Sequence, residues 1–244
     1  MIKNVFLVFF VGILSLANIS GMTRALNPIK PPSIYFEDFS SDLYKKLNDE
    51  ELSYKAFQTA LKGFLSLRSE NKLKNERYLT IIDMSISANK NRFFLIDLNN
   101  KSIIHKSIVA HGRNSGGEFA KLFSNKVGSF KSSIGFYKTA ETYNGKHGLS
   151  LRLDGLEHSN NNARKRAIVI HAADYVSDVF ISNNGRLGRS LGCPSLPLKN
   201  YSKIIDNIKN GSVLFIYYPN QEYLQSSKLA NGKIANNTDN ISSI

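Results

Sequence analysis

The chain contains one cysteine, Cys193, within a run of residues that suits nucleophilic chemistry. That run reads GRSLGCP over 188–194, and a histidine, His171, ends the apolar run AIVIH over 167–171. A thiol flanked by glycine and serine, with a histidine on an adjacent strand, is the pattern of a cysteine nucleophile and its general base. The sequence therefore predicts Cys193 as the nucleophile and His171 as the base.

The cysteine run also supplies groups that such chemistry needs around the thiol. An acyl-transfer site requires donors for an oxyanion, and the backbone amides of Gly192 and Cys193 are predicted to provide them. Positive charge favours the thiolate, and Arg189 or Arg186 can supply that charge. The base must also be oriented through its second ring nitrogen. For His171 the sequence leaves three candidates open for that role: Asp174, Ser190 or a backbone carbonyl.

The other histidines give little support for a metal site. His111 and His147 lie beside glycines and can line a cleft. His105 and His158 are expected to be structural or solvated. A zinc site needs three or four ligands, whereas the sequence has five scattered histidines, one cysteine and no HExxH motif. No metal and no organic cofactor is predicted.

Short strands are expected to position these residues. Runs rich in β-branched and aromatic residues predict strands over 78–85, 92–98, 102–110, 134–138, 149–153, 167–171 and 213–218. Upstream, leucines and phenylalanines recur three to five residues apart, which predicts helices over 38–48 and 50–68. A further helix is predicted over 198–209. The fold class is therefore mainly β, with short helices and an N-terminal helical segment.

The first residues have the pattern of an export signal. Lys3 precedes 13 apolar or small residues over 5–17, fewer than the roughly 18–20 that span a bilayer. An exported protein usually pairs its cysteines, so one free thiol favours a chemical role over that of a small buried apolar residue. The predicted location is the periplasm or cell envelope, with membrane association only if the signal is uncleaved.

The positive charge of the chain favours an anionic partner. Removal of residues 1–25 lowers the formal net charge from +13 to +11. For an exported protein, acidic lipid headgroups or an acidic wall polymer fit this charge, and no nucleic acid partner is predicted. Scattered lysines that keep the surface soluble are an equal alternative, because no block of five like charges occurs.

Composition and pattern divide the chain into four parts. We expect a signal peptide over 1–25, a helical leader or cover over 26–72, a catalytic domain over 73–219 and a flexible polar tail over 220–244. The tail is assigned because the sequence after Pro219 is rich in Asn, Ser and Lys and has little to bury.

Several ordered blocks over about 90 residues resemble the L,D-transpeptidase catalytic domain of cell-wall enzymes, in its murein L,D-transpeptidase catalytic-domain-like branch. The matching stretches are FSN at 123–125 with GS at 128–129, SIGFY at 133–137, YNGKHGLSLRL at 143–153, RAIVIH at 166–171 and GRSLGCP at 188–194. The resemblance implies an L,D-transpeptidase-like β-sandwich with Cys193 and His171 as its catalytic pair. It also implies substrate contacts, which we assign to Arg189, Ser190, His147, Tyr143 and Lys146.

The cysteine motif departs from that of the best-studied family members. Those carry Ser/Thr-His-Gly-Cys with an arginine two positions after the cysteine, whereas this chain has Leu191 in place of the histidine and Ser195 after Pro194. Substrate positioning is the property that these departures affect. Arg189, just before the motif, is a candidate to replace the carboxylate contact of the missing arginine.

The resemblance implies acyl transfer on peptidoglycan stem peptides. In that reaction Cys193 forms a thioester with the donor stem, and an amine of a second stem forms the cross-link. Two alternatives stay open: a hydrolase, or L,D-carboxypeptidase, that cuts stem peptides without transfer, and a wall-binding protein without activity. Dependence of the products on an amine acceptor distinguishes the transpeptidase from the hydrolase. Reactivity of the thiol distinguishes both enzymes from the inactive wall-binding protein.

Overall fold

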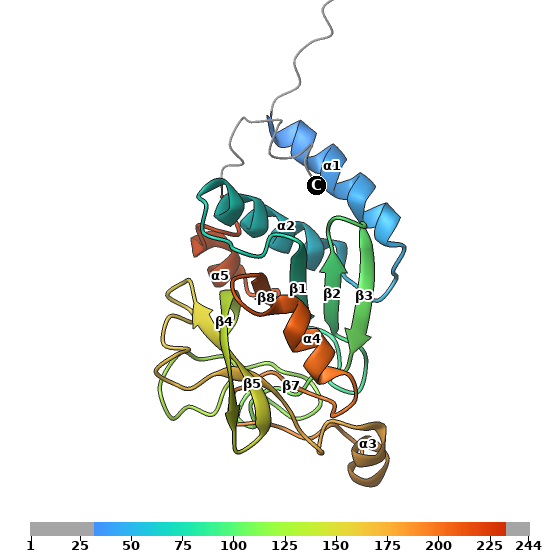
Figure 1. Ribbon diagram of the computed structural model, residues 1–244, viewed down its shortest axis with the longest axis vertical. Coiled ribbons are helices and arrows are strands. Elements are labelled where there is room, and N and C mark those ends of the chain that lie inside the picture. The colour runs from blue at the N-terminus through green and yellow to red at the C-terminus, as the bar shows by residue number, and fades with distance from the viewer. Residues whose placement is uncertain (1–31, 233–244) are drawn as a thin grey trace, which may run out of the picture. The chain divides into compact units, whose positions relative to one another are not determined.

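Two helices precede the sheet. The structure, a computed structural model, describes residues 32–232. Helix α1 spans Pro32–Leu47 and helix α2 spans Tyr54–Ser69 (Figure 1). The Ser53 hydroxyl accepts a hydrogen bond from the Ala56 amide at 3.2 Å and so caps the start of α2. Both helices predicted upstream of the strands are confirmed, although α1 begins earlier than the pattern indicated.

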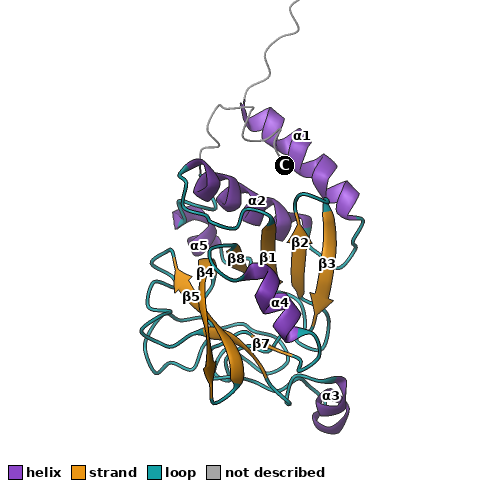
Figure 2. Cartoon of the chain, in the orientation of Figure 1, coloured by secondary structure: helices purple, strands orange, loops and turns teal. Residues whose placement is uncertain are grey.

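All eight strands of the described chain belong to one mixed sheet, in the order β3-β2-β1-β8-β4-β5-β6-β7. Figure 2 shows β2 between β1 and β3 in this sheet. The strands are β1 Tyr78–Asp83, β2 Phe93–Asp97, β3 Ser102–Ser107, β4 Gly135–Gly145, β5 Gly148–Gly155, β6 Val169–Ala172, β7 Ser195–Leu196 and β8 Val213–Tyr217. The predicted class, mainly β with short helices and an N-terminal helical segment, is confirmed. The pattern does not predict β7, because two residues are too few to show an alternation.

Strand pairing brings the predicted base and the cysteine segment together. Strand β6 pairs antiparallel with β5, which puts His171 opposite Ser150. On its other side β6 pairs parallel with β7, which puts His171 opposite Ser195. Paired strands lie about 4.8 Å apart. Cys193 comes two residues before Ser195, so the nucleophile segment runs beside the strand that carries His171.

The two helices and the sheet share one core. Phe57 and Phe64 of α2 are buried together with Phe136 of β4 and Phe215 of β8, whose ring centroids lie 4.1 Å apart. A side chain at Gly63 would have its Cβ 2.2 Å from the Phe136 ring, so only glycine lets α2 approach the sheet this closely. Helix α2 therefore packs against the sheet.

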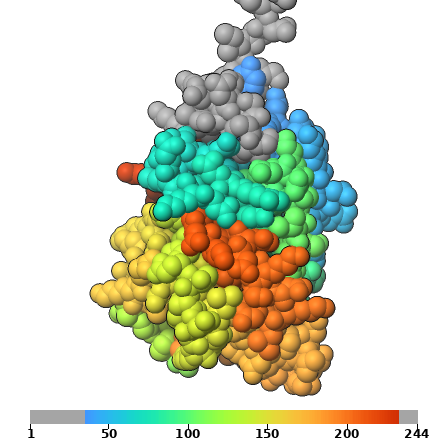
Figure 3. Space-filling model, in the orientation of Figure 1, coloured from blue at the N-terminus to red at the C-terminus, as the bar shows by residue number. Residues whose placement is uncertain are grey.

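Three short helices complete the described chain: α3 Asp178–Asn184, α4 Tyr201–Ile208 and α5 Gln221–Ser226. On the face shown in Figure 3, the β4–β5 hairpin (yellow-green) lies beside the segment that carries α4 (orange), and α4 contacts β5. Helix α4 confirms the helix predicted over 198–209. No helix in the described range 32–232 is long and apolar enough to cross a membrane.

Helix α5 corrects one prediction, the flexible tail from residue 220. Tyr223 is buried, and its hydroxyl donates to a carboxylate oxygen of Glu157 at 2.7 Å. The Asn220 side chain accepts the Tyr223 amide at 2.7 Å and caps the helix. One anchored aromatic residue thus orders a stretch whose composition is polar. The tail prediction is wrong for the described part of the segment, and its remainder, like the predicted signal at 1–25, lies outside the described residues.

Candidate active site

Serine hydroxyls hold the turn that carries Cys193. The Ser190 hydroxyl donates to the Cys193 carbonyl at 2.6 Å and accepts the Gly192 amide at 3.0 Å. From the other side, the Ser132 hydroxyl donates to the Gly192 carbonyl at 3.3 Å and accepts the Gly112 amide at 3.0 Å. Both serines are buried. Such bonds fix the backbone of the nucleophile before any substrate binds.

Gly192 has a backbone conformation that other residues rarely adopt. Its φ is +127°, and a Cβ at this position would lie 3.0 Å from the Lys131 carbonyl oxygen and 3.1 Å from Ile168 Cδ1. Because its amide is engaged by Ser190, Gly192 is not free to donate to an oxyanion, contrary to the prediction. The Cys193 amide has no hydrogen-bond partner within residues 32–232 and keeps that capacity.

The Cys193 side chain is partly exposed, and its thiol donates to a backbone carbonyl, that of Ala167, at 3.7 Å. Ala167 has a φ of +53°, an uncommon conformation for a non-glycine residue that is typical of functional sites. Desolvation by burial raises the pKa of the Cys193 thiol, although the Val169 amide and the charges of Arg166 and Lys146 oppose that rise. Burial therefore favours the neutral thiol form of Cys193 over the thiolate.

The His171 ring is oriented by a backbone carbonyl, one of the three candidates left open by the sequence. Its Nδ1 lies 2.9 Å from the Ala172 carbonyl oxygen, which can only accept, so Nδ1 carries the proton. The other nitrogen, Nε2, is then the basic one, and it lies 2.9 Å from the Ser195 hydroxyl oxygen. Burial lowers the pKa of His171, and the nearby charges of His147 and Lys146 lower it further. The imidazole is therefore neutral at pH 7, as a general base must be.

Two hydroxyl residues beside the base, Ser195 and Tyr175, were not predicted. The Tyr175 hydroxyl oxygen lies 3.1 Å from that of Ser195, which is itself fully buried. Gly188 makes room for this tyrosine, since a Cβ there would lie 2.5 Å from Tyr175 Cβ. The only signal in the sequence is proximity: Tyr175 follows the histidine by four residues, and Ser195 follows the cysteine by two.

The hairpin between β4 and β5 covers the base. The His147 ring stacks on the His171 ring, with centroids 4.4 Å apart and planes inclined by 24°. Lys146 is exposed on the same turn. Tyr143 is turned to another partner, because the Arg152 guanidinium lies 4.4 Å from its ring centroid. Of the predicted substrate contacts on this hairpin, the structure therefore brings His147 against His171 and Lys146 within electrostatic range of it.

Arg166 is a second residue that sequence reasoning missed. The residue is half-buried, and its guanidinium donates to the carbonyls of Ser124 and Lys131 and to the Ser133 hydroxyl. These partners are neutral oxygens, so its charge is not cancelled by a carboxylate among them. That charge acts on the Cys193 thiol and opposes the rise in its pKa that burial causes. Arg166 thus takes the electrostatic role that the sequence assigned to Arg186 or Arg189.

The predicted substrate contacts of the cysteine motif separate into two kinds. Ser190 is buried and uses its hydroxyl inside the turn, so it positions the nucleophile and does not face a ligand. Arg189 is partly exposed and donates to the carbonyls of Arg113 and Gly116 at 3.1 and 2.9 Å. Partial burial lowers the pKa of Arg189, as do the charges of Arg186 and Arg113. These three guanidiniums make the neighbourhood of Arg189 favourable for an anion.

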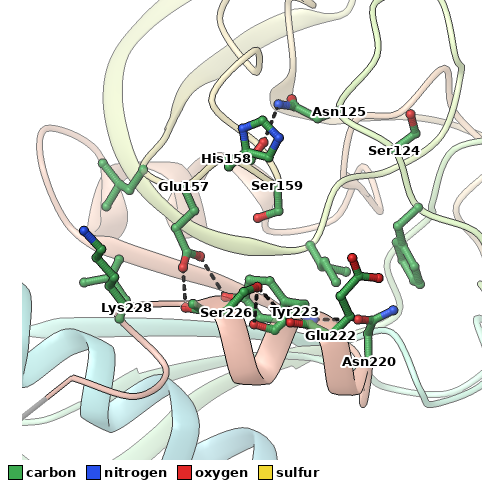
Figure 4. Close-up of a pocket in the computed structure, with 15 residues that line it drawn as sticks. Ser124, Asn125, Glu157, His158, Ser159, Asn220, Glu222, Tyr223, Ser226 and Lys228 are labelled. Carbon is green, nitrogen blue, oxygen red and sulfur yellow. Dashed lines mark hydrogen bonds between the residues drawn. The ribbon is translucent and has the colours of Figure 1, made fainter.

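A pocket of about 650 Å³ lies apart from this chemistry (Figure 4). It is lined by the 123–125, 156–159 and 220–229 segments, and none of the predicted site residues lines it. Glu157 at its edge accepts from the Phe136 amide and the Tyr223 hydroxyl, so this carboxylate anchors α5. Within the described residues, no group of three or more His, Cys, Asp or Glu side chains could hold a metal ion.

The comparisons with known proteins identify the family. The model of the L,D-transpeptidase catalytic domain matches residues 48–217, which is more than half of the chain, and the protein belongs to this family. The match includes the segments that carry His171 and Cys193. No curated protein sequence matches the chain.

Solved structures with some similarity include three L,D-transpeptidases. An L,D-transpeptidase from Mycobacterium smegmatis is 12% identical, with 58% of this chain and 59% of that chain covered and a TM-score of 0.37. L,D-transpeptidase 1 from Mycobacterium tuberculosis is 12% identical over 58% of this chain and 62% of its own, with a TM-score of 0.33. An L,D-transpeptidase from Xylanimonas cellulosilytica is 12% identical over 77% and 94% respectively, with a TM-score of 0.33. The chain thus spans about three fifths of the first two.

Proposed function

We propose that this protein is an L,D-transpeptidase that joins peptidoglycan stem peptides through a Cys193 thioester. The observation that carries the proposal is the orientation of the base. The bond from Nδ1 of His171 to the Ala172 carbonyl leaves Nε2 as the basic nitrogen, beside the turn that holds the only thiol of the chain. A neutral imidazole next to a prepositioned thiol is what cysteine-dependent acyl transfer requires.

In the first half-reaction the donor stem becomes attached to the enzyme. The Cys193 thiol loses its proton to His171, and the thiolate sulfur attacks the carbonyl carbon at the L-centre of the diamino acid. The Cys193 amide donates to the oxyanion. The C–N bond to the terminal D-alanine then breaks, the sulfur–carbon bond of the thioester remains, and the imidazolium returns its proton to the leaving amine.

In the second half-reaction an amine of a neighbouring stem attacks the thioester carbon. Neutral His171 takes the proton of that amine, the C–S bond breaks as the new amide cross-link forms, and the imidazolium returns the proton to the thiolate, which regenerates the thiol. Water in place of the amine gives a carboxypeptidase. Around this site, the exposed Lys146 and the group of three arginines that includes Arg189 suit the carboxylates of stem peptides, and His147 and Tyr143 complete the proposed substrate surface.

The proposal extends to organisation and location. Residues 73–219 form the catalytic domain, 26–72 its cover, and 1–25 a signal that exports the chain to the periplasm or cell envelope. A net positive charge suits a polymer rich in carboxylates. Peptidoglycan is the proposed partner, and no nucleic acid is involved.

The experiment incubates the full chain with a disaccharide-tetrapeptide and follows the products by mass spectrometry. We expect loss of the terminal D-alanine, a covalent acyl-enzyme on Cys193, and a cross-linked dimer whose yield increases with the concentration of amine acceptor. Cys193→Ala should abolish all three. His158→Ala, which changes an exposed histidine away from the thiol, is the matched control and should turn over normally.

Each alternative gives a different result in this assay. Release of D-alanine with no dependence on the amine indicates a hydrolase. Absence of turnover together with a thiol that resists alkylation indicates a wall-binding protein. Turnover that persists in a folded Cys193→Ala variant would falsify the nucleophile assignment.

A further inference from the structure

The hydrogen bonds around His171 have a fixed direction. Because Nδ1 donates to a carbonyl, Nε2 must accept, and the Ser195 hydroxyl is therefore the donor in the 2.9 Å contact between them. With its own proton committed, the Ser195 oxygen accepts from the Tyr175 hydroxyl at 3.1 Å. Protons thus point from Tyr175 through Ser195 to His171.

The Cys193 thiol is not hydrogen-bonded to the base. It donates to the Ala167 carbonyl, and among the described residues no hydrogen bond joins it to His171. Nε2, the only nitrogen that can take the thiol proton, is occupied by Ser195. A route for the proton must therefore either displace this hydroxyl or pass through it.

Ser195 is well placed for the second route. It lies two residues after Cys193, is fully buried, and stands opposite His171 in the register of β6 and β7. The thiolate of Cys193 also acts electrostatically on Tyr175, the hydrogen-bond partner of Ser195. Burial raises the pKa of Tyr175, and the charge of the Cys193 thiolate raises it further.

We propose that the Ser195 hydroxyl passes the proton of the Cys193 thiol to Nε2 of His171, with Tyr175 as the residue that positions Ser195. The thiol turns from Ala167 toward Ser195. Its proton then moves to the serine oxygen as the serine proton moves to Nε2. The serine keeps one proton throughout, and the products are a thiolate and an imidazolium.

The charged and titratable groups around this relay are few. Lys146 and His147 face His171 from the hairpin, Arg166 acts on the thiol from the segment before β6, and Asp174 acts on Tyr175. The cations favour the thiolate that the relay produces.

Alkylation of the thiol tests the relay without any substrate. The chain has one cysteine, so the rate of modification of the full chain by iodoacetamide reports on Cys193 alone. The alkylation rate is measured between pH 5 and 9. Near pH 7, Ser195→Ala should react about tenfold more slowly than wild type, and its pH profile should lose the limb that reflects the titration of His171. Ser195→Thr, which keeps the hydroxyl, should restore that limb.

If the thiol instead passes its proton directly to the imidazole, Ser195→Ala should change the alkylation rate in the opposite direction. If Ser195 only blocks Nε2, then Ser195→Ala frees the base, and alkylation near pH 7 should stay unchanged or become faster. Either result overturns the proposal. Ser212→Ala removes another fully buried hydroxyl and is the matched control, since it should leave the pH profile unaltered.

A second variant keeps the test decisive if Ser195→Ala does not fold. Tyr175→Phe removes only the hydroxyl that positions Ser195, and we expect a two- to fivefold slower reaction near pH 7 with the same change of shape. An unaltered pH profile in this variant counts against the relay.

The relay rests on the proposed function for its role in acyl transfer, but the two fail separately. Alkylation involves no muropeptide, and muropeptide turnover by the wild type does not depend on how the proton travels.

Discussion

His171, at the end of β6, and His111, beyond β3, are both buried histidines, yet their ring nitrogens have opposite assignments. In His171 a carbonyl takes the proton of Nδ1 and leaves Nε2 basic. In His111, Nδ1 lies 2.8 Å from Nη2 of Arg92, which can only donate, so Nε2 carries the proton. The basic nitrogen of His111 is thus spent on a buried cation, and that of His171 faces a hydroxyl beside the nucleophile.

The surroundings make the same distinction. Arg92 is fully buried and also donates to the carbonyls of Val109 and Ile86, so it ties three segments together. Burial lowers the pKa of His111 to about 3, with the Arg92 charge as the next cause. A histidine that stays neutral at every physiological pH, with no nucleophile beside it, serves the fold. Residue type and burial alone therefore do not identify a general base. The position of the unprotonated ring nitrogen and the group beside that nitrogen do.

The largest expected effect separates the two histidines by activity. His171→Ala should lower muropeptide turnover about 10²–10⁴-fold, because general base catalysis is lost. Its melting temperature should remain near that of wild type. His111→Ala should instead lower the melting temperature, with turnover per folded molecule largely kept. Turnover and thermal melting of both variants check this, and a fully active His171→Ala would remove the basis of the comparison.

The next effect concerns the stability of the His111 region. Arg92→Met should lower the free energy of unfolding by at least about 3 kcal/mol, since it leaves buried carbonyls and the His111 nitrogen without a donor. Arg113→Met, at an exposed arginine stacked on Phe130, should cost less than about 1 kcal/mol. Urea denaturation of both variants measures the difference. Equal losses would mean that Arg92 does not hold this region.

Local pattern is enough to propose a catalytic pair but not its partners. Cys193 and His171 follow from a glycine-bearing turn and an apolar run, which are features of adjacent residues. The roles of Ser195 and of the Ala172 carbonyl depend on the register between β6 and β7, and that register is set by pairing across the sheet. The loss of the Gly192 amide as an oxyanion donor likewise depends on where the Ser190 side chain turns.

The fold shows the same division between local and distant causes. Helices α1, α2 and α4 and most strands have periodicities that a single sequence displays. Helix α5 does not, because its order depends on the bond between Tyr223 and Glu157, which are far apart in the chain. Strand β7 is too short for a pattern. The sequence therefore predicts elements with their own hydrophobic periodicity, and misses those that exist through one specific partner.

The third prediction uses pH to isolate His111. The unfolded chain protonates this histidine near pH 6.5, whereas the folded chain keeps it neutral down to a pKa of about 3. The unfolded state therefore binds more protons in this window, and stability falls by up to about 1.4 kcal/mol for each unit that the pH decreases. His111→Gln lacks this term, so its stability should fall less between pH 6.5 and 4.

Urea denaturation at several pH values in that window compares the two proteins. Asp83, whose pKa is raised by burial, contributes with the opposite sign in both and does not account for a difference between them. Parallel curves for wild type and His111→Gln would show that His111 is protonated in the folded state.

The smallest expected effect concerns how the neighbouring His147 lowers the pKa of His171. The stacked His147 ring shields His171 from water, and its charge also disfavours the imidazolium. Both causes lower the pKa of His171, so His147→Ala should raise it, and the acid limb of Cys193 alkylation should move to higher pH. His147→Phe keeps a stacked ring without the charge and should move the limb less. If the two variants titrate identically to wild type, the hairpin does not tune the base, and burial by the strands alone keeps His171 neutral.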